Sequence, residues 1–311
     1  MIYNQNEETM SREDLEQLQV ERLQSTLNRV YRNVAFYKSI FDKNKIDITR
    51  IKSSKDMALL PFTTREDLNN SYPYDMFAVP LKDIVRIHST SGTTGRPVVV
   101  GYTKNDLRHW TDCTARLLTA AGITEHDVVQ IAFHYDLFTG GFGFHQGAEA
   151  IGASVIPAST STLEKQILIM RDFKTTALLA TPGFALHIGL VLEEKKIHPE
   201  NLFLKAGIMG AEPWSEKMRE RISSLLHITP LDTYGLTEVM GPGVAGECQQ
   251  REGLHVNEDH FILEVINPDT GDAVGDGSEG ELVFTTITKE GFPLIRYRTG
   301  DLGSVVSREK C

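Results

Sequence analysis

Apolar residues recur at helical spacing in two parts of the chain. Between residues 11 and 37, leucines and valines fall near one face of a helix, and Ser11 with Asp14 forms a capping pair at its start. A second helix is predicted to open at Thr103 and end at Gly122. The first of these helices is expected to be structural.

From about residue 84 onward, short apolar runs alternate with helical segments. This alternation predicts an α/β fold, a layered and largely parallel sheet flanked by helices, whose ligands bind beyond the carboxyl ends of the strands. The predicted strands cover residues 84–87, 98–100, 128–133, 153–157, 176–180 and 205–209, and the helices between them include 163–173 and 213–226.

The rhythm changes after residue 250. Segments 260–266 and 281–286 look like strands, and a turn-rich stretch rather than a helix separates them. We expect a small antiparallel β-subdomain near the C-terminus. The chain is thereby divided into a helical N-terminal region (1–80), an α/β region (81–249) and a β-subdomain (250–311).

Composition restricts the class of protein. Apolar residues make up 41% and charged residues 24% of the 311 positions, as in an ordinary water-soluble domain. A net charge of −10 argues against nucleic acid as the main partner. No segment has the length of a membrane span, the N-terminus lacks the features of a signal peptide, and three cysteines make no disulfide framework. A cytoplasmic protein without a membrane partner is therefore expected.

The most informative segment runs from His88 to Pro97 and combines glycines with hydroxyl side chains. Such a loop can turn backbone N–H groups and hydroxyls toward a polyphosphate. The Walker pattern of P-loop kinases and GTPases needs four residues between its glycines and then Lys-Ser/Thr; here two residues are followed by Arg96 and Pro97. A flexible surface turn is the alternative. The predicted phosphate-binding residues are Ser89, Thr90, Ser91, Gly92, Thr93, Thr94 and Gly95.

Three more segments follow: 210–213 after one predicted strand, 232–238 after another, and 297–302 near the end. Their order resembles that in the adenylate-forming superfamily of acyl-CoA synthetases and luciferases. The resemblance extends from residue 30 to the end. Four further segments are similar to the phenylacetate–coenzyme A ligase family within that superfamily. They are residues 134–141, 244–248, 254–261 and 291–298.

The resemblance implies an ATP-dependent acid–thiol ligase. An aryl or arylacetic acid, such as phenylacetate, would form an acyl-adenylate with release of pyrophosphate, and coenzyme A would then displace AMP. The substrate carboxylate is itself the nucleophile and is ionised at neutral pH, so no catalytic Ser, Cys or His is required. Positioning and neutralisation of the α-phosphate charge would carry the reaction.

The resemblance also implies roles for single residues. Glu238 would hold Mg²⁺, Thr237 would donate to the α-phosphate, and Arg96 would face the leaving pyrophosphate. Tyr234 would stack on adenine and Asp301 would accept from the ribose hydroxyls. The remaining nucleotide-binding residues would be Gly210, Ala211, Glu212, Pro213, Asp232 and Gly235.

Each role has a structural alternative. Glu238 could simply place a charge at a helix N-terminus, Tyr234 could fill the core, and Asp301 could be an ordinary strand-end residue. The acid pocket is expected between the loop 135–142 and the segment 210–213. Its predicted walls are Phe133, Tyr135 and Phe138, with Gly140 and Gly141 leaving room for a flat ring; plain core packing is the alternative.

No Lys or Arg lies between Phe133 and Phe144, so an uncharged aryl acid is expected. A second constellation, Cys248, His255 and Cys311, could hold a structural zinc ion with His260 or a later residue as fourth ligand. Two separate buried thiols are the alternative there.

The family continues with a mobile C-terminal lid domain that carries a lysine for the first half-reaction. Nothing after Asp301 and Leu302 matches it, so the chain is expected to be the large N-terminal domain only and to adenylate poorly alone. The rival functions are an adenylating enzyme that delivers the acyl group to a carrier protein, a catalytically weak nucleotide-binding module, and a general α/β binding protein. A homodimer is a further predicted partner.

Overall fold

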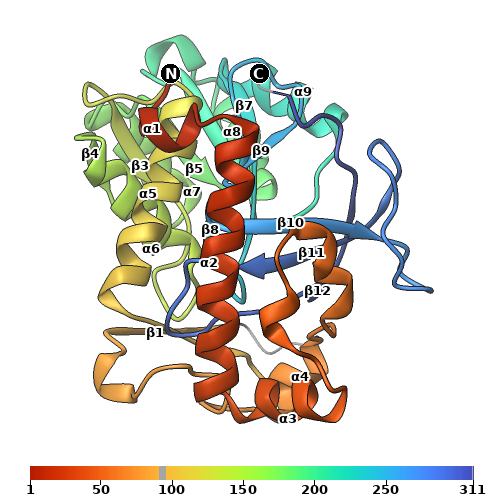
Figure 1. Cartoon of the computed structure of the whole chain (residues 1–311). Coiled ribbons are helices and arrows are strands. Elements are labelled where there is room, and N and C mark those ends of the chain that lie inside the picture. Colours follow the sequence, from red (N-terminus) through yellow and green to blue (C-terminus); the bar gives the residue numbers. More distant parts are fainter. Residues whose placement is uncertain (91–95, 310) are drawn as a thin grey trace. The chain divides into compact units, whose positions relative to one another are not determined.

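The computed structural model describes residues 1–90, 96–309 and 311, and the chain forms two compact units (Figure 1). The first unit comprises Met1–Glu8 and Trp110–Val256, and the second comprises Thr9–His109 and Asn257–Cys311. Each unit contains its own β-sheet structure.

A seven-stranded sheet forms the centre of the first unit, in the order β4-β3-β5-β6-β7-β8-β9. Strands β3, β4, β5, β6 and β7 run parallel to one another, whereas β8 and β9 are antiparallel to their neighbours. The predicted largely parallel sheet is thus confirmed. The strands are β3 (Val128–Ile131), β4 (Ser154–Ile156), β5 (Ala177–Ala180), β6 (Ala206–Gly210), β7 (Thr229–Leu236), β8 (Gly241–Glu247) and β9 (Leu254–Val256).

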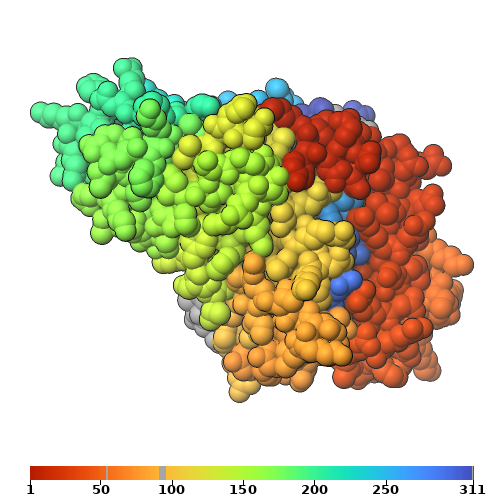
Figure 2. Space-filling view, turned by 90° about the vertical axis from the view of Figure 1, so that its left-hand side faces the viewer, coloured from red at the N-terminus to blue at the C-terminus, as the bar shows by residue number. Residues whose placement is uncertain are grey.

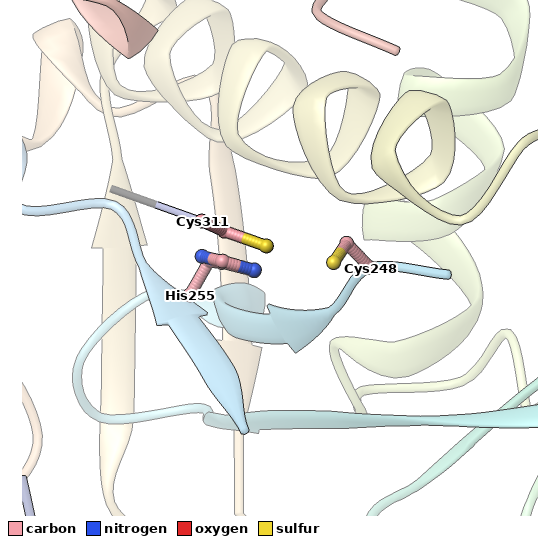
Figure 3. Close-up of side chains that lie close together, drawn as sticks. All are labelled: Cys248, His255 and Cys311. Carbon is pink, nitrogen blue, oxygen red and sulfur yellow. The ribbon is translucent and has the colours of Figure 1, made fainter. Parts of the chain in front are cut away.

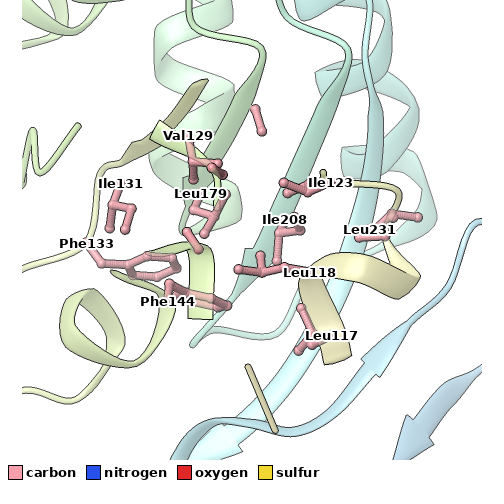
Figure 4. Packing of buried hydrophobic residues seen from close by; sticks show 14 residues of the cluster. Leu117, Leu118, Ile123, Val129, Ile131, Phe133, Phe144, Leu179, Ile208 and Leu231 are labelled. Carbon is pink, nitrogen blue, oxygen red and sulfur yellow. The ribbon is translucent and has the colours of Figure 1, made fainter. Parts of the chain in front are cut away.

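Helices cover both faces of this sheet. Alternate residues of β5 join different apolar clusters, because successive side chains of a strand point to opposite faces. Leu179 packs with residues of α5 and α6 (Figure 4), and Leu178 packs with residues of α7, α8 and α9. The helices are α1 (Gln5–Glu8), α5 (Lys104–Ala120, in this unit from residue 110), α6 (Gly140–Ala150), α7 (Leu163–Asp172), α8 (Pro182–Glu194), α9 (Glu216–Leu226) and the 3₁₀ helix η4 (Pro199–Asn201).

The second unit combines helices with two antiparallel sheets, β1-β2 and β10-β11-β12. The predicted antiparallel subdomain is confirmed, with β12 as a third strand. Figure 2 shows the red and orange N-terminal segments of this unit side by side on one face. Its elements are α2 (Arg12–Asn33), α3 (Ala35–Lys43), η1 (Ile48–Arg50), η2 (Ser54–Leu59), α4 (Arg65–Asn70), η3 (Leu81–Asp83), β1 (Arg86–Ser89), β2 (Val99–Tyr102), β10 (Phe261–Ile266), β11 (Gly280–Thr286) and β12 (Tyr297–Gly303).

Two predicted elements differ from the structure. The helix predicted over 11–37 is two helices, because Val34 adopts an extended conformation (φ −114°, ψ 109°) between α2 and α3. The glycine-rich segment predicted as a loop begins α6 instead. A Cβ on Gly143 would lie 2.6 Å from the Trp110 ring, and one on Gly147 would lie 2.6 Å from Thr114. These glycines therefore serve close packing of α6 on α5.

The predicted capping pair of the first helix is present, and the helix predicted to open at Thr103 has an equivalent pair. Ser11 accepts the backbone N–H of Asp14 at 3.1 Å, and Thr103 accepts that of Asp106 at the same distance. Within the described ranges, none of the helices combines the length and apolar character needed to cross a membrane.

Candidate functional site

Two predicted motifs meet on neighbouring parallel strands of the first unit. Met209 at the end of β6 pairs with Asp232 of β7, and Gly210 pairs with Thr233. A Cβ on Gly210 would lie 2.5 Å from the Thr233 carbonyl oxygen, so the close approach requires glycine. Ala211 follows with φ at +69°, a left-handed conformation that turns the chain out of the strand. The carboxyl end of β6 thus carries the segment 210–213 beside β7.

The structure changes the description of several residues in these motifs. Asp232, Tyr234 and Gly235 lie on β7 itself, not after the strand as predicted. The Glu212 side chain accepts the backbone N–H of Gly183 at 2.6 Å, in the first turn of α8, so it caps that helix while Pro213 stays exposed. Tyr234 is half-buried rather than part of the core.

A buried ion pair between Arg219 of α9 and Glu247 of β8 is hydrogen-bonded to the backbone of β7. The Arg219 guanidinium donates to both carboxylate oxygens of Glu247, at 2.6 and 3.1 Å, and lies 4.5 Å from the ring centre of Trp214. Glu247 also accepts the backbone N–H of Asp232 at 2.7 Å. Burial raises the pKa of the Asp232 carboxyl, although a hydrogen bond from Trp214 opposes the shift. One network therefore connects α9, β7 and β8.

Thr237 and Glu238 lie in the tight turn between β7 and β8, and each is only 4% exposed. The backbone N–H groups of Val239 and Met240 both donate to the Leu236 carbonyl, at 3.2 and 3.1 Å. This turn runs directly into β8 in the described chain, so the alternative of a charge at a helix N-terminus is wrong for Glu238.

Side chains join the segment 232–238 to the predicted acid-binding loop 135–142. The hydroxyl oxygens of Thr139 and Thr237 lie 3.0 Å apart, and both residues are buried. Trp110 on α5 holds the start of β8, next to this turn, because its indole N–H donates to the Pro242 carbonyl at 2.9 Å. The start of α6 and the β7–β8 turn are therefore held together within the first unit.

The predicted aromatic and glycine residues of the acid pocket also come together. A Cβ on Gly140 would lie 3.0 Å from Phe138, and one on Gly141 would lie 3.1 Å from the Tyr135 ring. The space beside these glycines is thus occupied by the chain's own rings, not left open as expected. Phe133 is 3% exposed and belongs to the apolar core, whereas Phe138 is 36% exposed and Tyr135 is half-buried.

The remaining predicted nucleotide ligands belong to the second unit. Ser89 pairs with Val99 across β1 and β2, and the Thr90 backbone N–H donates to the Val98 carbonyl at 3.0 Å. The Thr90 hydroxyl accepts the Val98 N–H at 3.0 Å, which closes the base of the predicted phosphate loop. Ser91, Gly92, Thr93, Thr94 and Gly95 lie outside the described residues.

Arg96 and Asp301 are both exposed. The Arg96 guanidinium lies 5.9 Å from the ring centre of Tyr72, and Asp301 lies on β12. By contrast, the segment 291–298 is structural: Arg296 donates to Glu264 at 2.8 and 3.0 Å and stacks 4.0 Å from the ring centre of Phe62.

Two of the three predicted zinc ligands lie together in the first unit. Cys248 follows β8, His255 is on β9, and their ligand atoms lie within 4.8 Å of one another (Figure 3). The antiparallel pairing of Glu247 with Leu254 produces this arrangement. Cys248 is half-buried and His255 is exposed, so the alternative of a buried thiol is wrong for Cys248. Cys311, also labelled in Figure 3, belongs to the second unit.

Residues 12–288 match the sequence profile of the AMP-binding enzyme family. The chain belongs to this family. The resemblance to phenylacetate–coenzyme A ligases is thereby confirmed as well, because similar proteins with that name include one from Thermus thermophilus, 43% identical over all of this chain and 70% of the relative. Another, from Escherichia coli, is 47% identical over 95% of this chain and 68% of the relative.

Solved structures of CoA ligases are similar to this chain as well. 2-Hydroxyisobutyryl-CoA ligase, in complex with 2-HIB-AMP and CoA, has a TM-score of 0.91 to this chain at 27% identity. The match covers 97% of this chain and 66% of that protein. The chain thus spans about two thirds of the length of these relatives. An AMP-forming acid–CoA ligase, as predicted, is the class to which these similarities assign it.

Sequence reasoning missed several residues of this AMP-binding fold. Thr139 lies in the predicted loop 135–142 without an assigned role, although its buried hydroxyl is hydrogen-bonded to that of Thr237. His145 and Glu149 are four apart on α6 and hydrogen-bonded, a spacing that the helical assignment of 140–150 would have revealed. Arg219 and Glu247 are far apart in sequence and carry no local signal.

Proposed function

We propose that this chain activates an uncharged aryl acid of the phenylacetate type. The acid's carboxylate attacks the α-phosphorus of ATP, which forms the acyl-adenylate and releases pyrophosphate, and the thiol of coenzyme A then displaces AMP. The observation that carries the proposal is the Thr139–Thr237 hydrogen bond, because it joins the predicted acid-binding loop 135–142 to the segment 232–238. The names of the relatives, phenylacetate–coenzyme A ligases, support the substrate class.

Thr237 and Glu238 would act at the phosphates. Glu238 is 4% exposed, and its carboxylate supplies the hard oxygen donors that suit Mg²⁺. Glu238 would hold this ion, which would supply neutralisation of phosphate charge. Thr237 would donate its hydroxyl to the α-phosphate, and Arg96 would face the departing pyrophosphate.

The nucleoside would be held by both motifs of β6 and β7 and by Asp301. The backbone of 210–213 would contact the adenine edge, assisted by the Asp232 carboxyl, and Tyr234 would stack on the base. Asp301 would accept from the ribose hydroxyls. Residues 89–95 would wrap the phosphates, supported by the Thr90–Val98 closure at the base of the loop.

The acid pocket would use Tyr135 and Phe138, the two predicted wall residues that are not in the core. The absence of Lys and Arg between Phe133 and Phe144 supports an uncharged ring. Coenzyme A is favoured over a carrier protein as acyl acceptor, because the similar structure binds CoA beside 2-HIB-AMP. Dimer formation stays a prediction that analytical ultracentrifugation would test.

The function is tested on the 311-residue chain with ATP, Mg²⁺ and a panel of aryl acids. We expect phenylacetate to yield phenylacetyl-AMP detectable by mass spectrometry, and added coenzyme A to convert it to the thioester. Both ligands should also raise the melting temperature, since they bind the native state. Failure to bind ATP at millimolar concentration would reject the proposal. Acyl transfer to a carrier protein but not to coenzyme A would show that the carrier protein is the acyl acceptor.

Zinc binding by Cys248 and His255, with Cys311 as a third ligand, is also proposed. Thiolate and imidazole are the donors that zinc prefers, and the first two come from adjacent strands (Figure 3). We expect about one zinc per chain by mass spectrometry of metals. Removal by a chelator should lower the melting temperature by several degrees.

Cys248→Ser is expected to lose most of this zinc, whereas His126→Asn, at an exposed histidine of the same unit, should retain it. A wild-type protein that binds no zinc, and whose melting temperature zinc does not change, would contradict the proposal.

A further inference from the structure

A chain of hydrogen bonds leads from the predicted acid pocket to the surface of the first unit. The Tyr135 hydroxyl lies 3.1 Å from Nδ1 of His145, and Nε2 of the same ring lies 3.1 Å from Oε1 of Glu149. Tyr135 follows β3, while the other two residues are on α6. Exposure of the side chains rises outward, with His145 at 28% and Glu149 at 62%.

For a neutral His145 ring, the chemistry of the three groups fixes the direction of each hydrogen bond. A carboxylate only accepts, so Nε2 of His145 must carry the proton that it shares with Glu149. Nδ1 of a neutral imidazole is then an acceptor, and the Tyr135 hydroxyl donates to it. Burial raises the pKa of the Tyr135 phenol and the charge of Glu149 acts in the same direction, so the phenol keeps its proton.

The Tyr135 ring is confined by its neighbours as well. Phe142 meets it edge-on, with ring centres 5.3 Å apart at 74°, and the His145 ring lies 5.8 Å away at 88°. Gly141 approaches so closely that a Cβ there would lie 3.1 Å from the tyrosine ring. With its hydroxyl also tied, the ring has little freedom to rotate.

We propose that His145 and Glu149 are positioning residues that set the selectivity for the acid by holding Tyr135 in one orientation. This inference rests on the proposed function, in which Tyr135 is a wall of the acid pocket. Because the Tyr135 hydroxyl is hydrogen-bonded to His145, the apolar face of the ring is the part that faces the acid, and it stays in one place. The fixed ring limits the length of the acid that the pocket accepts, so an acid with one more methylene than phenylacetate binds more weakly.

The test compares binding of phenylacetate and 3-phenylpropionate by calorimetry. For the wild type we expect phenylacetate to bind about tenfold more tightly or better, the range that one methylene commonly gives. His145→Phe keeps a ring but removes both hydrogen bonds, and should lower this preference about tenfold. Glu149→Ala, at an exposed position, should lower it less.

Rescue and control variants separate positioning from general damage. His145→Asn retains an acceptor near the place of Nδ1 and is expected to recover most of the preference. His126→Asn, which changes the exposed pair with Glu125, should leave it unchanged. ATP affinity should stay within about twofold of wild type in every variant, because His145 and Glu149 contact none of the proposed nucleotide ligands.

A nitrogen-15 NMR spectrum of the histidines supplies a second readout, in which His145 should show the Nε2–H tautomer near neutral pH. The inference is overturned if that ring is Nδ1–H, or if His145→Phe keeps the wild-type preference. Should ATP bind the wild type but neither acid bind, the proposed acid class fails together with this inference.

Discussion

Replacing Glu238 by glutamine is expected to slow phenylacetyl-AMP formation by about 10²- to 10³-fold, the usual cost of losing one preorganised electrostatic group at a reacting centre. Glutamine keeps the size of the side chain, so the buried turn between β7 and β8 should keep its packing. What is lost is the negative charge proposed to hold Mg²⁺ beside the phosphates. The rate is measured by mass spectrometry of the adenylate at saturating ATP.

Glu252→Gln is the matched control, since Glu252 is an exposed glutamate of the same unit. It should retain the wild-type rate, and both variants should melt within about 2 °C of the wild type. The proposed role of Glu238 is rejected if its variant forms the adenylate within threefold of the wild-type rate.

The second large effect is expected from the buried ion pair between Arg219 and Glu247. Arg219→Met is expected to reduce the free energy of unfolding by about 3–5 kcal/mol, because it leaves the Glu247 carboxylate buried without its partner. Urea unfolding followed by circular dichroism measures the loss. The double variant Arg219→Met/Glu247→Leu removes both charges and should recover much of it.

The comparison distinguishes charge burial from lost packing. Methionine replaces most of the apolar stem of arginine, so a cost from packing alone would persist in the double variant. A loss below about 1 kcal/mol in Arg219→Met would mean that water reaches the pair and screens it.

Much of the fold could be predicted from local pattern. Apolar runs such as 176–180 and 205–209 became β5 and β6, because a strand buried on both faces must be continuously apolar. The motif 232–238 also predicted a ligand site near the carboxyl ends of the strands. The alternative that Glu238 starts a helix is wrong, because the chain makes a tight turn there between β7 and β8.

Other features depend on contacts between distant residues and were not visible in the sequence. The sequence predicts a loop over 135–142, but Gly140 and Gly141 begin α6, and Gly143 and Gly147 let this helix approach Trp110 and Thr114. The pairing of Arg219 with Glu247 needs the register of α9 against β8. The hydrogen bond between Thr139 and Thr237 likewise joins positions 98 residues apart.

Trp110 and Trp214 are the two tryptophans of the chain, and both belong to the first unit. One indole is bonded to Pro242 beside the Glu238 turn, and the other lies against Arg219 below Asp232. The unlabelled protein therefore contains its own optical reporters next to the nucleotide motifs. Excitation that selects indole over the tyrosine phenols therefore reports on this unit, and substrate-induced quenching can be recorded without attaching a dye.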